Sequence, residues 1–250
     1  MQFSRNWLKD FIDLNISIED ICYQLTMAGV EVDGYDSFNS KITGKDSIIK
    51  LDITPNRGDC FSVYGIAREL AVINNIKLKN SNIKLMKSSF KEDLKIQVCK
   101  EAPRYVGRSI TNIDIKAKTL PLVAERLSLS DQKLIDPVVD ITNYVLLELG
   151  QPLHAFDRDK LEGDINVRQA KRDESLTLLD DTEVKLNPNY LVISDEKKSI
   201  ALAGIMGGKN TCVGSNTKSI FLESAFFKPS AIRGRARRLG FQTDASIRFE

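Results

Sequence analysis

The sequence predicts an α+β fold, with a small N-terminal α+β domain over residues 1–90 and a larger mixed domain over residues 91–250 that holds a mainly antiparallel sheet. Helical and strand-like periodicities alternate in the first region. Residues 77–93 are rich in Lys, Ser and Asn and lack sustained periodicity, which is typical of a linker. From residue 165 onward, short β-like runs follow one another between turns.

The composition argues against a disordered protein, a membrane protein, a polycationic nucleic-acid binder and a disulfide-rich protein. The chain has 250 residues, of which 42% are hydrophobic and 28% are charged, close to the average for globular proteins. No apolar run approaches the roughly 20 residues that span a bilayer, so we expect a cytoplasmic protein without a membrane segment. The net charge of +2 implies that any contact with RNA is local. The four cysteines form no CxxC pair, so we expect reduced, mostly buried thiols.

The first domain is expected to contain two short helices, two strands and a longer helix. The second helix has Ser17 as its N-cap and Gly29 just past its end. A polar stretch between the strands, residues 37–46, is interpreted as a loop. The turn formers of residues 54–59 precede the longer helix, which ends near Asn74. The predicted ranges are helices at 6–12 and 17–28, strands at 30–35 and 48–53, and a helix at 61–73.

The second domain begins with two strands and two helices and continues as a series of short strands. The second of these helices ends at Gly150, and Pro152 follows it. The predicted ranges are strands at 94–99 and 104–115, helices at 120–129 and 140–150, and strands at 165–169, 176–178, 184–186, 191–194, 200–202 and 220–222.

His154 is the one histidine of the chain, and its position after the helix stop predicts a loop. An imidazole there can act as a general base or orient a water molecule near neutral pH. A hydrogen-bonded structural histidine is the commoner role for a lone residue of this type. No second histidine or cysteine pair lies at ligand spacing, so we predict no metal site.

Two further segments could contribute to a site. The glycines of AGIMGGK, residues 203–209, do not match a phosphate-binding loop, but they allow the backbone to approach a ligand or another chain segment closely. Glu223 lies in an apolar run, where an unpaired carboxylate is costly to bury. It is therefore expected either to pair internally or to recognise a polar group of a substrate.

The densest basic cluster comprises four arginines at helical spacing, Arg233, Arg235, Arg237 and Arg238. Such a run forms either a solvated helix face or a contact with phosphate groups, and the sequence favours neither.

Several segments, taken together and in order, resemble the β subunit of bacterial phenylalanyl-tRNA synthetases. The N-terminal WLK at residues 7–9 and TMAGVEVDG at residues 26–34 are similar to the start of that subunit. The other matching segments are ITPNRGDC at 53–60, PRYVGR at 103–108, VDITNYVLLELGQPLHAFD at 139–157, GRARR at 234–238 and TDASIRFE at 243–250. The resemblance covers essentially the whole chain.

The resemblance implies an editing domain of phenylalanine–tRNA ligase, which hydrolyses tyrosine mischarged onto tRNA-Phe. By position, His154 and Glu223 match the catalytic editing pair, and Glu223 matches the group that meets the tyrosine hydroxyl. The residues that match substrate-binding positions are Asn143, Gly204, Gly207, Thr243 and Ala245, together with Lys133 where the family commonly has an arginine. The expected partners are tRNA-Phe and a catalytic α subunit in an αβ heterotetramer that uses ATP and Mg²⁺; no cofactor is expected in this chain itself.

Two departures from the family define an alternative. Residues 37–46 stand where the family usually carries an RNA-binding oligonucleotide-fold module. The chain is also expected to stop before the regions that bind the α subunit, hold Mg²⁺ and read the anticodon. A non-catalytic docking or RNA-binding module is therefore the second hypothesis.

Overall fold

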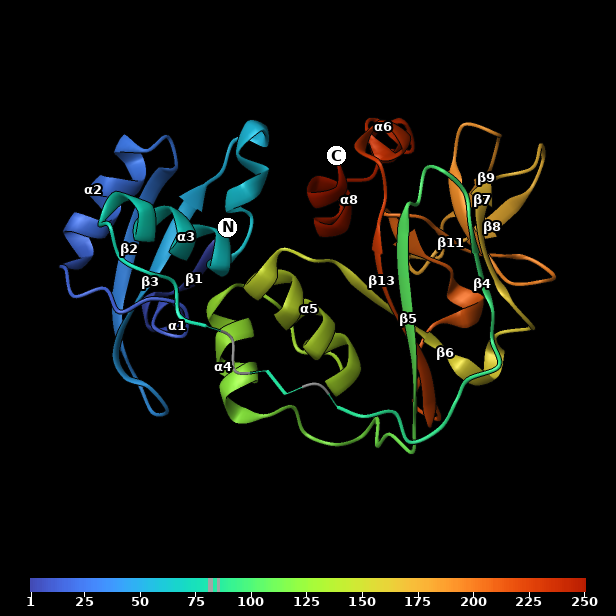
Figure 1. The fold of residues 1–250 in the computed structure, drawn as a ribbon, viewed down its shortest axis with the longest axis horizontal. Coiled ribbons are helices and arrows are strands. Elements are labelled where there is room, and N and C mark those ends of the chain that lie inside the picture. Colours follow the sequence, from blue (N-terminus) through green and yellow to red (C-terminus); the bar gives the residue numbers. More distant parts are fainter. Residues whose placement is uncertain (81–82, 85) are drawn as a thin grey trace. The chain divides into compact units, whose positions relative to one another are not determined.

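The computed structural model describes residues 1–80, 83–84 and 86–250, and these form two compact units. The first unit comprises residues 1–87 and 118–151, and the second comprises residues 88–117 and 152–250 (Figure 1). The sequence predicted a single boundary near Lys91, whereas the chain passes between the units three times. The predicted linker, residues 77–93, lies partly outside the described residues.

The first unit is a three-stranded antiparallel sheet with helices. The sheet order is β1-β3-β2. Its elements are β1 (Gln2–Ser4), α1 (Arg5–Leu8), α2 (Ile18–Met27), β2 (Glu31–Ser40), β3 (Gly44–Asp52), α3 (Val63–Ile73), α4 (Pro121–Leu129) and α5 (Pro137–Leu149). As predicted, the side chain of Ser17 caps α2 by accepting from the backbone N–H of Asp20, and Gly150 ends α5 in the left-handed conformation, with φ of 76°.

Helices α4 and α5 belong to the first unit because their apolar sides complete its core. Leu127 and Leu147 are buried in the same cluster as Trp7, whose ring stacks on Tyr144 at 4.8 Å between centroids. The Arg126 guanidinium lies over the Trp7 ring and donates to the hydroxyl of Tyr144 at 2.7 Å. The contacts of Trp7 with Tyr144 and Arg126 join residues more than 100 positions apart, which explains why a linear boundary did not capture the unit.

The prediction of a loop over residues 37–46 was wrong. Strands β2 and β3 form one long hairpin whose pairing continues from Glu31↔Asp52 to Ser40↔Gly44. The polar composition led to the loop prediction, but a strand on an exposed hairpin pairs through its backbone and needs no apolar side chains there. The turn itself occupies residues 41–43.

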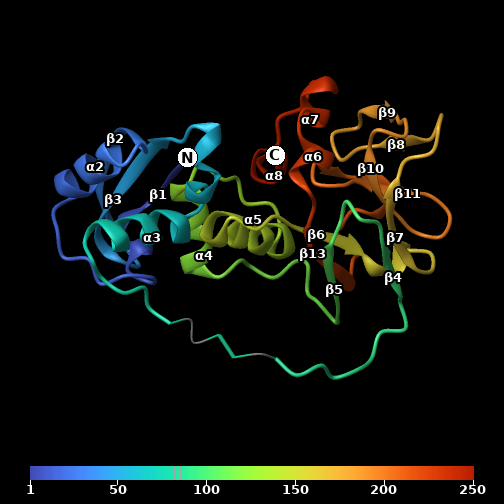
Figure 2. The ribbon, with the colours of Figure 1, turned by 45° about the horizontal axis from the view of Figure 1, so that its top comes forward.

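The second unit consists of short strands with three small helices at the C-terminal end. Its sheets have the orders β12-β11-β10-β7-β4, β5-β13-β6 and β8-β9 (Figures 1 and 2). The elements are β4 (Ile96–Val98), β5 (Arg104–Thr111), β6 (Leu153–Asp157), β7 (Ile165–Gln169), β8 (Ser175–Thr177), β9 (Glu183–Lys185), β10 (Leu191–Ser194), β11 (Ser199–Leu202), β12 (Met206–Gly207), β13 (Ser219–Phe226), α6 (Pro229–Ile232), α7 (Arg235–Arg238) and α8 (Asp244–Phe249).

The α+β fold class is confirmed, and so is the mainly antiparallel pairing. Among the strands of the described residues, β4 and β7 form the parallel pair, and every other pair is antiparallel. Strands β10 and β11 are buried along their whole length and occupy the middle of the second core. No helix within the described ranges is long and apolar enough to cross a membrane.

Candidate active site

His154 and Glu223 face each other across two neighbouring strands. His154 lies on β6 and Glu223 on β13, and the antiparallel register pairs them directly. Directly paired residues project their side chains from the same face of a sheet. The prediction of a loop around His154 was wrong: the segment after Pro152 forms β6, an edge strand of the sheet β5-β13-β6.

Glycine at position 207 allows the backbone of β12 to lie against the imidazole. A β-carbon there would lie 2.3 Å from Cε1 of His154 and 2.6 Å from its Nε2, far inside van der Waals contact. Gly204 makes the preceding turn with φ of 69°, and a β-carbon there would lie 3.1 Å from Ile232 and 3.2 Å from Phe249, closer than an ordinary van der Waals contact. The close approach that the glycines predicted is therefore made to other chain segments, one of which is His154 itself.

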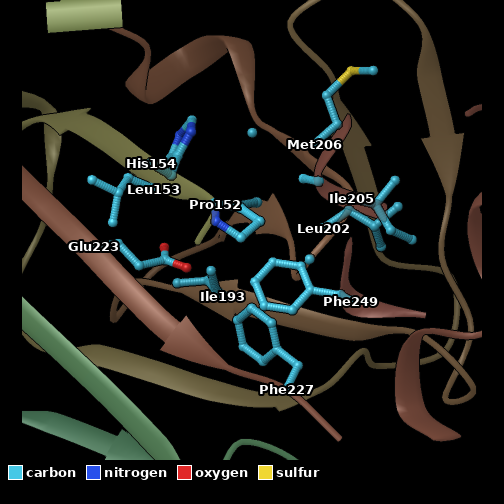
Figure 3. A pocket seen from close by; sticks show the side chains of 14 residues that line it. Pro152, Leu153, His154, Ile193, Leu202, Ile205, Met206, Glu223, Phe227 and Phe249 are labelled. Carbon is cyan, nitrogen blue, oxygen red and sulfur yellow. The ribbon is translucent and has the colours of Figure 1, made fainter. Parts of the chain in front are cut away.

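These residues surround one pocket of the second unit. The pocket has a cavity volume of about 70 Å³, which is room for several water molecules. Figure 3 shows His154 and Glu223 on one side and the rings of Phe227 and Phe249 on another. Its lining consists of Pro152, Leu153, His154, Ile193, Ala201, Leu202, Gly204, Ile205, Met206, Gly207, Glu223, Phe227, Ala245 and Phe249.

Glu223 is a buried carboxyl with one hydrogen-bond partner among the described residues. Only 5% of the residue is exposed, and its Oε2 accepts from the hydroxyl of Tyr105 at 3.1 Å. Burial raises the pKa of Glu223 to about 8, and the Tyr105 hydrogen bond opposes that rise without cancelling it. At neutral pH the carboxyl therefore carries its proton and can donate a hydrogen bond.

His154 presents an unsatisfied nitrogen in this pocket. Its Nε2 is buried and has no hydrogen-bond partner in the part of the chain that the structure describes. The ring packs edge-on against Phe156 at 4.5 Å between centroids. Burial lowers the pKa of His154 to about 4, so the imidazole is neutral at physiological pH. Buried polar atoms without a partner are rare, and this one marks a place for a water molecule or a ligand.

The pocket therefore combines apolar walls with two polar groups of defined protonation state. Neutral His154 can accept or donate through Nε2, and protonated Glu223 can donate. A base with a pKa near 4 removes protons poorly at pH 7, since general-base catalysis is most efficient when the pKa is near the working pH. The imidazole is thus better suited to orienting a water molecule than to taking its proton.

The other predicted site residues occupy three kinds of position. Ala245 lines the pocket from α8. Thr243 does not line it but caps α8 and donates to the carbonyl of Ile205 at 2.9 Å, which ties the helix to the pocket wall. Asn143 and Lys133 belong to the first unit, Asn143 on α5 and Lys133 at an exposed position of the irregular segment before it. Their proposed roles stay predictions.

Several pocket residues were not anticipated. Phe227, Phe249 and Met206 line the walls, and Tyr105 supports Glu223 from strand β5. Periodicity identifies such residues only as core, because their part in the pocket depends on contacts between distant segments. Tyr105 lies in the predicted strand 104–115, but nothing in the local sequence indicates that its hydroxyl reaches Glu223.

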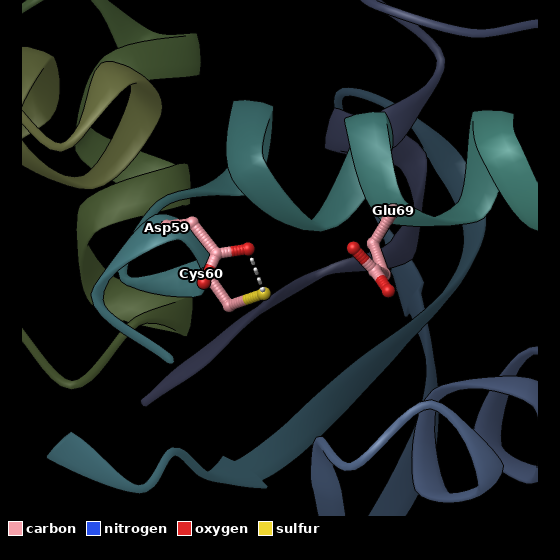
Figure 4. A group of neighbouring side chains, drawn as sticks. All are labelled: Asp59, Cys60 and Glu69. Atoms are coloured by element: carbon pink, nitrogen blue, oxygen red, sulfur yellow. Dashed lines mark hydrogen bonds between the residues drawn. The ribbon is translucent and has the colours of Figure 1, made fainter. Parts of the chain in front are cut away.

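A second cluster of ionisable groups lies in the first unit. Figure 4 shows Asp59, Cys60 and Glu69, whose ligand atoms lie within 4.8 Å of one another. Arg57 already compensates both carboxylates, at 3.1 Å from Asp59 and 3.1 Å from Glu69, and it donates to the Cys60 sulfur at 3.1 Å. Burial raises the pKa of Cys60 to about 12, so the thiol keeps its proton. The charge of this cluster is therefore already balanced by the Arg57 guanidinium.

The comparisons with known proteins agree with the segments quoted from the sequence. Residues 101–250 match the family model described as the B3/4 domain. The chain is 51% identical over 207 residues to the phenylalanine–tRNA ligase β subunit of Photorhabdus laumondii, covering 82% of this chain and 26% of that protein. It is 43% identical over 251 residues to the corresponding subunit of Vibrio cholerae, covering 100% and 31%.

The chain thus spans between a quarter and a third of the length of these curated relatives. Among solved structures it is similar to an N-terminal fragment of the phenylalanyl-tRNA synthetase β subunit from Pyrococcus horikoshii. That similarity has a TM-score of 0.44 at 20% identity and covers 93% of this chain and 70% of the other.

Proposed function

Because the chain belongs to the B3/4 domain family and to the bacterial phenylalanine–tRNA ligase β subunits, we propose that its second unit is a proofreading site that hydrolyses Tyr-tRNA-Phe. The observation that carries the proposal is the direct pairing of His154 with Glu223 across β6 and β13. Both residues line one pocket, and within the described residues the buried Nε2 of His154 has no hydrogen-bond partner.

In this proposal the tyrosyl side chain enters between the apolar walls and its hydroxyl meets Glu223. A phenylalanyl group leaves the Oε1 side of that buried carboxyl without a partner, which costs roughly 1–3 kcal/mol and lowers the hydrolysis of the phenylalanyl ester by about 5- to 150-fold. A site that recognises a hydroxyl discriminates strongly, because a substrate without the hydroxyl leaves a buried polar group of the site without its hydrogen bond. The same pocket is suited to accept tyrosine and to reject the cognate amino acid.

The chemical step is the attack of water on the ester carbonyl. A bond forms between the water oxygen and the carbonyl carbon, the bond to the terminal ribose oxygen breaks, and that oxygen takes up a proton. His154 orients the water through Nε2, in keeping with its low pKa of about 4. The products are tyrosine and uncharged tRNA. The step uses neither ATP nor a covalent intermediate on the chain.

The larger assembly is also part of the proposal. The relatives are named as β subunits of a ligase, and this chain covers a minor part of their length. We infer that it acts with tRNA-Phe and a catalytic α subunit in the cytoplasm, where the whole enzyme uses ATP and Mg²⁺ to charge tRNA. Asn143 and Lys133 are proposed as contacts of the aminoacylated end.

The proposal is tested by single-turnover deacylation of Tyr-tRNA-Phe and Phe-tRNA-Phe with this chain, alone and after adding the α subunit. We expect tyrosine to be released faster than phenylalanine, the release to be lost in His154→Ala, and the preference for tyrosine to be lost in Glu223→Gln. Glu183→Gln is the matched control because it makes the same chemical change at an exposed position of β9 in the same unit.

Release that equals the spontaneous rate under both conditions, with tRNA still bound in a filter assay, would support a docking or RNA-binding module instead. Release that persists in both pocket variants would place hydrolysis elsewhere in the protein. Equal loss in Glu183→Gln would show that the variants act through the fold.

A further inference from the structure

A tyrosine on the neighbouring strand supports the carboxyl of Glu223 from behind the pocket. Tyr105 lies on β5, pairs with Ala225 and donates its hydroxyl to Oε2 of Glu223 at 3.1 Å. Glu223 is directly opposite Gly107, two residues further along β5, so Tyr105 reaches it diagonally on the same face. Tyr105 does not itself line the pocket.

The other residues that the structure describes on this face of β5 form no side-chain hydrogen bond with the carboxyl of Glu223. Gly107 has no side chain, and the ring of Phe221 lies over it, where a β-carbon would come within 2.1 Å of the ring. Ser109, the next residue on the face, donates to Glu92. Within the described residues, Tyr105 is therefore the only side chain that bonds Glu223.

The bond leaves one oxygen of Glu223 for a ligand. Burial raises the pKa of Tyr105 well above its usual value, so its phenol is neutral and donates. Because Oε2 accepts that bond, a proton carried by the carboxyl resides on Oε1. We propose that Tyr105 is a positioning and specificity residue, whose hydroxyl holds Oε2 of Glu223 so that Oε1 is presented to the hydroxyl of a bound tyrosyl group.

This inference rests on the proposed function, since it assigns the group that makes Glu223 selective. Without the Tyr105 hydroxyl, Oε2 becomes a buried acceptor without a partner, and either oxygen can turn toward the pocket or away from it. The site then loses the fixed donor that distinguishes a phenol from a phenyl ring. Hydrolysis itself depends on His154 and water and is affected less than the preference.

The test compares Tyr105→Phe with Tyr190→Phe. Tyr190 is buried in the same core and its hydroxyl makes no hydrogen bond among the described residues, so this variant controls for removing a phenol oxygen. We expect Tyr105→Phe to lower the ratio of tyrosine to phenylalanine release about tenfold and Tyr190→Phe to leave it unchanged. Thermal unfolding of each variant measures any effect on the fold.

Two further measurements separate a positioning role from a structural one. In a Glu223→Gln background, Tyr105→Phe should change the ratio no further, because the residue acts through the carboxyl. Since the Tyr105 bond lowers the pKa of Glu223, the pH at which the carboxyl titrates, followed by carbon-13 NMR, should rise in Tyr105→Phe. An unchanged ratio and an unchanged titration would overturn the inference.

Binding of L-tyrosinamide and L-phenylalaninamide distinguishes the two proposals. If wild-type protein prefers tyrosinamide but hydrolyses neither ester, the proposed function fails, and loss of the preference in Tyr105→Phe still supports the role of Tyr105. If wild-type protein hydrolyses Tyr-tRNA-Phe selectively and Tyr105→Phe keeps both preferences, the inference alone fails. If wild-type protein shows neither preference, both proposals fail.

Discussion

Gly207 and His154 lie so close that the pocket tolerates no side chain at position 207, since a β-carbon there would be 2.3 Å from Cε1 of the imidazole. Two segments 53 residues apart in the chain thus define the place of one functional group. The edge of the imidazole that carries Cε1 and Nε2 therefore lies directly against the backbone of β12.

The first prediction concerns this contact. Gly207→Ala should displace the imidazole and reduce single-turnover hydrolysis of Tyr-tRNA-Phe about 100-fold, because a misplacement of about 1 Å has effects of that size. Overpacking should lower the free energy of unfolding by about 1–3 kcal/mol. Gly214→Ala is the control, since a β-carbon there meets nothing within 4 Å. Full activity in Gly207→Ala would show that the imidazole's position is unimportant.

The second prediction concerns the pH dependence of stability. The pKa of Glu223 is about 8 when folded against an ordinary value of 4.5, so between these pH values the folded state binds more protons and stability falls as pH rises. In Glu223→Gln the position does not titrate, so this decrease of stability with rising pH is absent. The variant should gain stability relative to wild type by up to roughly 1.4 kcal/mol per pH unit over that window. Urea unfolding at pH 5 and pH 8, followed by circular dichroism, measures it; a constant difference contradicts the buried carboxyl.

A third prediction concerns hydrolysis on the acid side. The pKa of His154 is about 4, so the imidazole stays neutral down to that pH. Tyrosine release, corrected for the spontaneous rate, should show no inflection near pH 6.5 and should decline only as the pH approaches 4. An exposed histidine would lose its neutral form near pH 6.5. An inflection near pH 6.5 in wild-type protein would mean that the imidazole is hydrated.

The fourth prediction concerns Arg57. It donates to the Ala28 carbonyl at 2.7 Å and pairs with Asp59 and Glu69. Arg57→Ala should lower the free energy of unfolding of the first unit by about 2 kcal/mol, because it leaves several partly buried acceptors unpaired. Trp7, the only tryptophan, lies in that core and reports its unfolding by fluorescence. Arg68→Ala removes a more exposed pair and should cost less than about 0.5 kcal/mol. Equal losses of unfolding free energy in Arg57→Ala and Arg68→Ala would contradict this account.

The sequence predicted the helices and strands that are determined by local signals, such as a capping residue or a short apolar run between turns. Strands β7 and β10 have the predicted bounds, and α2 begins at its Ser17 cap. Helix α5 begins earlier than predicted, because Asp136 caps it and Pro137 occupies its first turn. That signal was present in the sequence and was missed.

The candidate site was predictable only in part, for a physical reason. His154, Glu223 and the glycines were visible as residue types, but their meeting depends on the register of β6 with β13 and on the approach of β12. Such long-range contacts carry no local periodicity. Strand β6 was missed because an imidazole that closely follows a helix stop and a proline is typical of a loop as well.

The threefold passage of the chain between the two units bears on how the protein is made. On the ribosome, the first unit cannot be completed when residue 87 emerges, because α4 and α5 are still to come; Gln2 finds its partner, the carbonyl of Leu129, 127 residues later. Strand β5 likewise waits for β13, which begins at Ser219. Each unit is therefore completed only after a segment of the other has been synthesised, and no single cleavage yields two intact halves.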